Sequence, residues 1–309
     1  MKTHTINASD GYPLTVYTYP SSQQTKGMVL IVHGLGEYGR RYEAFADKLT
    51  QSGYHVVSFD QRGHGKSNQD NPSIHFKSRK GNRALYLDTK MMIDYAKTID
   101  PSLPCFVFAH SMGSFVVRQC LHEDPFIVDG VVLSGSPLLN KLNLSLGLLI
   151  ALFIRLVKGN KHCSRWFTKT FADAPYKSMR KRGMIQKRHE WTTADKAMQQ
   201  AYLDDPLTQK PLTIQAHIDL MRLMRKAQPS RKRSKTSIPT PIALYTGRDD
   251  ALCLYGKATI QLQTFLIKHH FNHVDLFLIE HTRHELLNET NRDETSKHMI
   301  HTINRMQPQ

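Results

Sequence analysis

Six short apolar segments constrain the fold of this chain more than any other feature of its sequence. Each has the length of a β-strand and holds consecutive β-branched or aromatic residues instead of alternating polar and apolar ones. Strands that are covered on both faces, as in parallel sheets, have this pattern. The segments are residues 28–32 (MVLIV), 55–59 (HVVSF), 105–108 (CFVF), 128–133 (VDGVVL), 241–245 (PIALY) and 274–279 (VDLFLI).

Helix-like segments separate several of these runs, for example residues 42–52 (YEAFADKLTQS) and 111–122 (SMGSFVVRQCLH). The alternation of strand and helix predicts an α/β fold with a mostly parallel central sheet flanked by helices. The alternation is interrupted once, at residues 137–237, which carry helical patterning and basic clusters but no buried strand. We therefore expect a core formed by residues 1–136 and 238–309, with a helical cap inserted at 137–237.

The charge of the chain is unevenly distributed. Residues 137–237 hold 21 Lys and Arg against 6 Asp and Glu, which accounts for +15 of the formal net charge of +16. A strongly basic chain suggests an anionic partner such as nucleic acid or a membrane surface. Because the rest of the chain is nearly balanced, the simplest interpretation is an ordinary enzyme core with a basic insertion, and we expect no nucleic-acid partner.

Cysteine usage and the start of the chain bear on its compartment. Cys105, Cys120, Cys163 and Cys253 form no C-x-x-C pair, and the opening MKTHTINASDGY lacks the apolar stretch of a secretory signal. These features predict a reduced, cytoplasmic protein. The most apolar run, residues 144–154 (LSLGLLIALFI), is shorter than the roughly 20 residues that span a bilayer. It predicts a core or interfacial helix, which leaves open a peripheral position on the inner face of a membrane.

Residues with catalytic chemistry follow three of the apolar runs. The segment FVFAHSMGSF places Ser111 at a sharp turn between a strand and a helix, close to the G-x-S-x-G pattern of a serine nucleophile. Asp249 and Asp250 follow the run at 241–245, and His284 follows the run at 274–279. In open α/β sheets the reacting groups gather at the carboxyl ends of the strands. Nucleophile, acid and base thus occur in the chain order that α/β-hydrolases use.

One position departs from the serine pattern, because Ala109 stands where the pattern has a glycine. The flanking glycines keep side chains out of the space where strand and helix approach closely, so a small residue meets the requirement. Gly113 supplies the second glycine. The alternative interpretation is that Ser111 only caps the helix that follows it. The aspartate and histidine downstream favour a catalytic nucleophile.

Several segments together resemble the monoacylglycerol lipase and lysophospholipase group of α/β-hydrolases. They are HGLGEYGRRYEAFADKL, GYHVVSFDQRGHGKS, AHSMGS, GRDDALC and RHELLNE, with AYLDDPL at 201–207 inside the insertion. The resemblance covers most of the chain. It implies that Ser111 is the nucleophile, His284 the general base and then acid, and Asp250 the group that orients and stabilises the imidazolium. The spacing from the glycine of GRDD favours Asp250 over Asp249.

The same resemblance implies an oxyanion hole formed by the backbone N–H groups of Leu35 and Met112. The implied activity is hydrolysis of carboxylic esters of single-acyl lipids, monoacylglycerols or lysophospholipids, through an acyl-enzyme. A general carboxylesterase, thioesterase or peptidase of the same fold stays open, as does a basic membrane-binding module with little turnover. The head group and chain length of the substrate stay open as well.

No cofactor or metal is expected. The RGHGKS loop lacks the spacing of a phosphate-binding loop, and no Cys/His set has zinc spacing. Of the 17 histidines, we expect His33 to shape the oxyanion loop and His64, His110 and His281 to be neighbours of the site.

The insertion is expected to govern access of the substrate. Its apolar run, which is followed by Arg155 and Lys158, suits an acyl-chain wall or a lipid interface. The alternative is a helix packed on the core. Basic clusters at 180–182, 187–188 and 231–235 would attract anionic head groups and favour peripheral association with an anionic membrane, or else form a solvated face.

Overall fold

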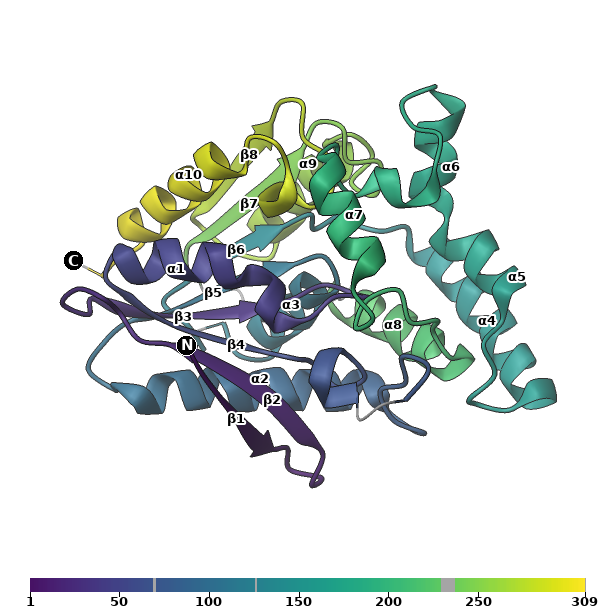
Figure 1. The fold of residues 1–309 in the computed structure, drawn as a ribbon, viewed down its shortest axis with the longest axis horizontal. Helices are drawn as coiled ribbons and strands as arrows, with labels where there is room; N and C mark the ends of the chain where they lie inside the picture. The colour runs from purple at the N-terminus through teal and green to yellow at the C-terminus, as the bar shows by residue number, and fades with distance from the viewer. Residues whose placement is uncertain (69–70, 126, 229–236, 309) are drawn as a thin grey trace.

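A computed structural model describes residues 1–68, 71–125, 127–228 and 237–308. Within these ranges eight strands form one sheet in the order β1-β2-β4-β3-β5-β6-β7-β8 (Figure 1). The six expected strands are all present, and neighbouring strands among them pair in parallel. They are β3 (Gly27–Val32), β4 (Tyr54–Phe59), β5 (Cys105–His110), β6 (Gly130–Ser134), β7 (Ile242–Gly247) and β8 (Val274–Ile279).

Two strands were missed from the sequence. β1 (Lys2–Asn7) and β2 (Pro13–Tyr19) pair antiparallel with each other, and β2 joins the sheet antiparallel to β4. β1 is the edge strand, and its residues alternate between exposed and half-buried along most of its length. Such a strand has no continuous apolar run, which is the signal that identified the other six.

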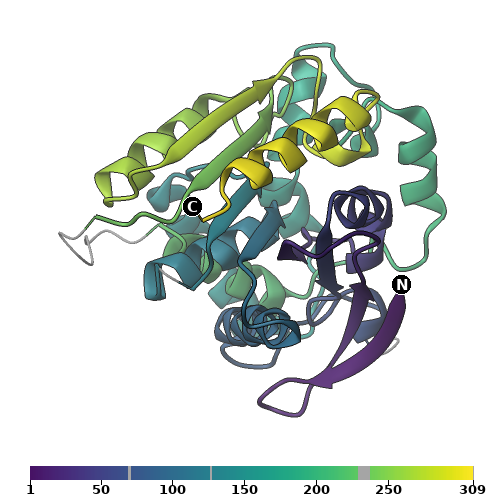
Figure 2. The same ribbon diagram turned by 90° about the vertical axis from the view of Figure 1, so that its left-hand side faces the viewer.

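Helices cover both faces of the sheet (Figures 1 and 2). α1 (Glu43–Gln51) and α10 (Arg292–Arg305) lie on one face, and α2 (Gly81–Ile99), α3 (Met112–Glu123) and α9 (Lys257–Lys268) lie on the other. Alternate residues of β3 enter different clusters, with Leu30 packed among α2 and α3 side chains and Val29 and Ile31 among those of α1 and α10. The continuous apolar runs are therefore explained by burial on both faces.

The described residues between β6 and β7 form helices and no strand. These helices lie together on the side of the molecule toward which β3 and β6 point (Figure 1). They are α4 (Lys141–Lys158), α5 (Arg165–Phe167), a π-helical turn at Thr168–Ala172, α6 (Ala174–Lys181), the 3₁₀ helix η4 (Arg188–Trp191), α7 (Lys196–Asp204) and α8 (Ile214–Lys226). Among the described helices, none is both long enough and apolar enough to cross a bilayer.

Helix α8 connects this helical region to the core, because two of its faces are buried. Its spacing of three or four residues places Ala216, Leu220 and Leu223 against the core helices α2 and α3, and Ile214, Ile218 and Met221 against α4. In α4 the buried residues are Gly147 and Ala151, whose small size allows the two helices to approach closely. The region between β6 and β7 thus has an apolar core of its own beside the sheet.

Candidate active site

Ser111 occupies a strained turn between β5 and α3. Its backbone has φ 47° and ψ −113°, which few residues other than glycine adopt. Its N–H donates to the carbonyl of Ser134 at 2.9 Å, which ties the turn to β6. The side chain makes no capping hydrogen bond to α3. The turn instead presents the Ser111 hydroxyl at the carboxyl end of the sheet.

The two positions that flank the turn have different steric demands. A Cβ atom at Gly113 would lie 2.3 Å from the carbonyl oxygen of Val32 and 2.6 Å from that of His33, so α3 can cross β3 only with glycine there. Ala109 is fully buried within β5, where its methyl group is accommodated. The departure from the serine pattern therefore falls at the position that tolerates a small side chain.

The structure brings Ser111, His284 and Asp250 into one line of hydrogen bonds. His284 Nε2 lies 2.9 Å from Ser111 Oγ, and His284 Nδ1 lies 2.9 Å from Asp250 Oδ2. The second carboxylate oxygen of Asp250 accepts the N–H groups of Leu252 at 2.8 Å and Cys253 at 3.2 Å, which fixes the carboxylate. Asp250 is fully buried, and it is the carboxylate of the adjacent aspartate pair that contacts the imidazole.

Burial and mutual attraction set the charges of this pair. Burial alone would lower the pKa of His284, but the Asp250 carboxylate outweighs it and raises that pKa above its usual value. Burial alone would raise the pKa of Asp250, but the charge and the hydrogen bond of His284 outweigh it, so the pKa of Asp250 is lowered. The site therefore favours an imidazolium beside a carboxylate.

Two backbone donors lie close to the turn that carries Ser111. Met112 is the first residue of α3, where the helix leaves its N–H groups unpaired and carries partial positive charge. Leu35 follows Gly34, whose Cβ position would be 3.2 Å from the Cβ of Ser111. Among the described residues, neither the Leu35 nor the Met112 N–H has a hydrogen-bond acceptor. The two predicted oxyanion donors are thus both near the serine and unoccupied by protein acceptors.

His33 fixes the loop that carries Leu35. Its Nε2 accepts the backbone N–H of Gln61 at 2.9 Å, so Nδ1 must carry the proton, which it donates to the carbonyl of Gly34 at 2.7 Å. Burial holds the pKa of His33 well below its usual value, so the ring stays neutral. These bonds agree with the expected role of His33 in shaping the loop.

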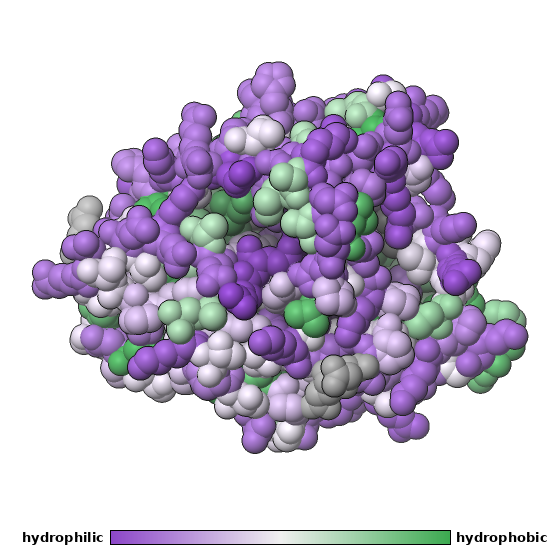
Figure 3. Space-filling view, in the orientation of Figure 1, coloured by the Kyte–Doolittle hydropathy of each residue, from purple (hydrophilic) through white to green (hydrophobic). Residues whose placement is uncertain are grey.

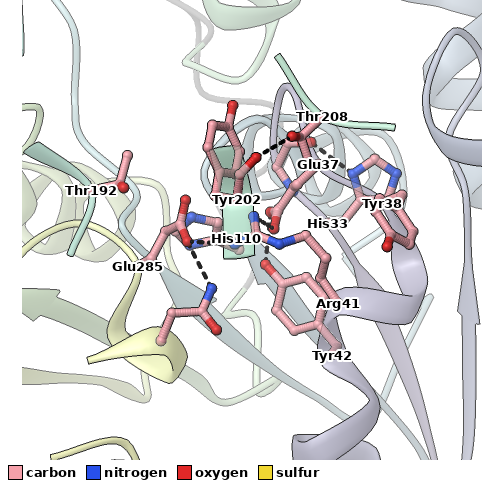
Figure 4. A network of polar contacts seen from close by, with 12 residues as sticks. His33, Glu37, Tyr38, Arg41, Tyr42, His110, Thr192, Tyr202, Thr208 and Glu285 are labelled. Atoms are coloured by element: carbon pink, nitrogen blue, oxygen red, sulfur yellow. Dashed lines mark hydrogen bonds and ion pairs between the residues drawn. The ribbon is translucent and has the colours of Figure 1, made fainter. Parts of the chain in front are cut away.

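A buried ionic network connects this loop to the loop of His284 (Figure 4). Arg41 pairs with Glu37 at 3.3 Å and with Glu285 at 3.1 Å. Glu37 also accepts the N–H of Gly34 at 2.5 Å and the hydroxyl of Tyr42 at 2.8 Å. Burial raises the pKa of Glu37, which Arg41 offsets only in part. The Arg41 guanidinium thereby links the loop that carries Leu35 to the loop that carries His284.

The same face of the core contacts the helical region. The Arg41 guanidinium lies 5.0 Å from the ring of Tyr202 on α7, and the Tyr38 hydroxyl donates to Asp205 at 2.7 Å. Tyr202 and Asp205 belong to the AYLDDPL segment. The sequence reading did not identify the Glu37 and Arg41 pair, although their spacing of four residues in HGLGEYGRR could have indicated an ion pair.

The three histidines expected to be neighbours of the site, His64, His110 and His281, differ in their surroundings. The ring of His110 lies 4.7 Å from that of His284, and burial lowers the pKa of His110 to about 3, so it adds no charge. His64 packs 5.1 Å from His33, one layer behind the site. His281 is exposed in the turn after β8. Within the described ranges, no group of three or more His, Cys, Asp or Glu side chains could hold a metal ion.

The RGHGKS loop is held by internal contacts. Asp60, two residues before the loop, accepts the N–H groups of Gly39 and Lys66, each at 2.8 Å. Arg62 is buried and pairs with Asp88 at 2.6 Å and Asp10 at 3.0 Å. The polar groups of this loop therefore stabilise the core.

Comparison with known proteins places the chain in a family. Residues 23–291 match the model of the family described as serine aminopeptidase, S33, and the chain belongs to this family. It is 29% identical over 130 residues to a human monoglyceride lipase, covering 42% of this chain and 41% of that protein. It is 35% identical over 111 residues to the phospholipase YtpA of Bacillus subtilis, covering 35% and 39%. The chain thus matches less than half the length of these relatives.

Solved structures resemble the chain over nearly its whole length. A carboxyl esterase from Bacillus coagulans in complex with glycerol superposes with a TM-score of 0.85 at 21% identity, covering 99% of this chain and 98% of that one. A monoglyceride lipase from Saccharomyces cerevisiae in complex with a substrate analog gives a TM-score of 0.76 at 18% identity, covering 100% and 96%. The predicted α/β-hydrolase fold is confirmed.

Proposed function

We propose that the chain is a serine hydrolase of carboxylic esters in which Ser111 is the nucleophile, His284 the base and then acid, and Asp250 its partner. The observation that carries the proposal is the unbroken hydrogen-bond line from Asp250 through His284 to Ser111, with the serine at a strained turn. An isolated serine at a helix start would explain neither the strain nor the buried pair of charges behind it.

The proposed reaction has two halves, and His284 acts as base and then as acid in each. Ser111 Oγ bonds to the ester carbonyl carbon while its proton passes to His284 Nε2, and the carbonyl oxygen becomes an oxyanion that Leu35 and Met112 N–H groups stabilise. The C–O bond to the alcohol then breaks, and the leaving alkoxide takes the proton from His284. Water attacks the acyl-enzyme with the same base, which releases the acid and restores Ser111.

The proposed substrate class is single-acyl lipid esters, monoacylglycerols or lysophospholipids. Leu35 and Met112 lie in an apolar cluster to which the helical region contributes partly exposed Leu212 and Met224. An alkyl chain leaving the oxyanion site would therefore meet apolar side chains. The names of the relatives, monoglyceride lipase and phospholipase, support a lipid ester as substrate, whereas the family description names a peptidase.

A substrate panel tests this proposal. We expect hydrolysis of monooleoylglycerol, or of lysophospholipids with choline or ethanolamine head groups, faster than that of amino-acid anilides, with all activity lost in Ser111→Ala. Asp250→Asn should be far more damaging than Asp249→Asn, because only Asp250 contacts the imidazole. Rapid anilide cleavage without lipid hydrolysis would instead support a peptidase, and equal activity in Ser111→Ala would contradict the proposed site.

We further propose that residues 137–237 form a cap that rests on an anionic lipid surface. Six apolar side chains form a stripe along the outer face of α4 at the spacing of one helix face, and each is 58–84% exposed: Leu142, Leu146, Leu149, Phe153, Leu156 and Val157. In Figure 3 hydrophobic atoms appear at the right-hand edge, where Figure 1 shows α4. The opposite face of α4 packs on α8.

The basic residues next to the stripe support a lipid membrane as the surface that it contacts. Exposed Lys158, Lys161 and Arg165 follow the stripe along the chain, with exposed Trp166 beside them. Aromatic and basic residues next to an apolar stripe are typical of helices that lie in the lipid interface. The basic clusters are partly engaged, since Arg188 pairs with Asp173 and Arg182 lies over the ring of Tyr255. The cluster at 231–235 lies outside the described residues.

Co-sedimentation with vesicles tests the proposed contact between the cap and an anionic lipid surface. We expect vesicles that contain phosphatidylserine to bind the protein better than neutral ones, with the difference reduced by salt. The double substitution Leu149→Ser and Leu156→Ser should reduce binding and leave hydrolysis of a small soluble ester unchanged. The matched control is the double substitution Ile260→Ser and Ile267→Ser on α9. The side chains of Ile260 and Ile267 are 45% and 54% exposed. Equal binding by both double variants would show that the stripe is not the contact.

A further inference from the structure

A tryptophan from the helical region lies on the ring of His284. The Trp191 and His284 ring centroids are 4.9 Å apart, and the ring planes differ by 28°, so the two rings stack. Trp191 is the last residue of η4, and its side chain packs against a buried apolar cluster that includes Ala251, the residue after Asp250. The indole is therefore held by the same loop that supplies the acid.

Two hydrogen bonds to main-chain carbonyl groups connect the segments of Trp191 and His284 on both sides of the stack. The residues directly before and after His284 bind the carbonyl groups directly before and after Trp191. Arg283 Nη1 donates to the carbonyl of Glu190 at 2.6 Å, and the Glu285 N–H donates to the carbonyl of Thr192 at 2.7 Å. These paired contacts fix the backbone on both sides of Trp191 relative to the loop of His284.

We propose that Trp191 is a positioning residue for His284, whose indole face holds the imidazole in line with Ser111 and stabilises the imidazolium that forms during the reaction. The inference rests on the proposed role of His284 as base. It adds that the helical region contributes to the chemical step as well as to access of the substrate.

The physical basis is the quadrupole of the indole. A cation over an aromatic face is attracted to it, most strongly for tryptophan and more so when the pair is shielded from water. When Ser111 transfers its proton to Nε2, the new positive charge on the ring has the Asp250 carboxylate at its Nδ1 edge and the indole over its face. When the leaving alkoxide takes the proton back, that stabilisation ends, so the contact favours the charged intermediate over the resting site.

Other titratable and charged groups lie around the imidazole or on the elements packed against it. They are Asp250 from the loop after β7, His110 from the end of β5, Glu37 and Arg41 from the region after β3, Arg283 and Glu285 from its own loop, and Glu190 and His189 from η4. A test must therefore distinguish His284 from these groups.

Fluorescence provides that test without turnover. The chain has two tryptophans, and Trp166 is 59% exposed, so Trp166→Phe leaves Trp191 as the single emitter. Because an imidazolium in contact with indole quenches its emission, we expect the emission of Trp166→Phe to fall as acidification protonates His284. The transition should disappear when His284→Gln is added and persist when His189→Gln is added. A transition that survives His284→Gln would overturn the proposal.

Kinetics on a soluble ester provide the second readout. Trp191→Leu should lower kcat about tenfold with a smaller change in KM, whereas Trp191→Phe should retain most of the activity. Because the indole favours the protonated ring, Trp191→Leu should also move the acid limb of the kcat/KM profile to lower pH. An unmoved limb, or equal losses in both variants, would overturn the proposal. A His284-dependent fluorescence transition without any ester hydrolysis would instead contradict the proposed function and leave the stack intact.

Discussion

Two apolar helices, α3 and α4, each follow a strand of the parallel sheet and differ in almost everything else. In α3, every residue from Met112 to His122 is buried, between the sheet and the helices α2 and α8. In α4 only Gly147 and Ala151 are buried, although its sequence is the more apolar of the two. Apolarity alone therefore does not determine burial. The partner surface does, and α4 has a partner on one face.

The first residues of the two helices differ in the same way. At the start of α4 the Asn140 side chain accepts the N–H groups of Leu142 and Asn143, which is an ordinary helix cap. At the start of α3 the Ser111 side chain caps nothing and bonds to His284. The same structural position therefore serves stability in one helix and is available for chemistry in the other.

Removing the polar side chain at the start of each helix should have opposite effects on activity and stability, and the loss of activity at Ser111 should be the largest change. Ser111→Ala should lower ester hydrolysis by about 10⁴-fold or more, with a change in unfolding free energy of about 1 kcal/mol or less. Asn140→Ala should do the reverse, with near-normal hydrolysis and a loss of about 1 kcal/mol. Kinetics and urea unfolding of both variants check this. A large loss of activity in Asn140→Ala would remove the distinction between the helices.

The glycines of the two helices give the next contrast. A methyl group at Gly113 would meet the backbone oxygen of Val32 at 2.3 Å, and this oxygen cannot move without the sheet. Gly113→Ala should therefore cost about 3 kcal/mol or more. At Gly147 the nearest atom is the terminal methyl of Met221 at 2.8 Å, which can turn away, so Gly147→Ala should stay within about 1 kcal/mol of the wild type. Thermal unfolding of both variants measures the difference, and similar costs would contradict it.

A matched pair of valines sharpens the comparison at the smallest scale. Val117 in α3 is 1% exposed and Val157 in α4 is 60% exposed. Because both changes to alanine alter helix propensity equally, the difference between them isolates burial. Val117→Ala should cost about 2 kcal/mol, and Val157→Ala should stay within about 0.5 kcal/mol. An equal cost would indicate that α4 packs against a further surface in solution.

The sequence predicts the core better than its edges. Runs such as β3 were recognised because both faces are buried, so nearly every residue is apolar. β1 was missed because it is the edge strand and its residues are exposed or half-buried, so it carries no continuous apolar run. The apolar segment at 144–154 was correctly expected to be helical, but its local pattern could not show that one face packs on α8 and the other stays exposed.

The candidate site shows the same division. Ser111, Asp250 and His284 could be identified because each follows a recognisable strand and the order of the three is informative. Trp191 gave no local signal, because its contact with His284 depends on how the helical region docks against a loop some 90 residues further along the chain. Glu285 was likewise missed, since its partner Arg41 lies far away in the sequence.

Covalent labelling by a fluorophosphonate tests the central claim most directly, because only an activated serine reacts readily with this reagent. Mass spectrometry of the intact protein and its peptides should find one adduct, located on Ser111. Labelling should be absent in Ser111→Ala and strongly slowed in His284→Ala, while His281→Ala should label like the wild type. An adduct on another serine with Ser111 unmodified, or labelling that does not depend on His284, would contradict the account.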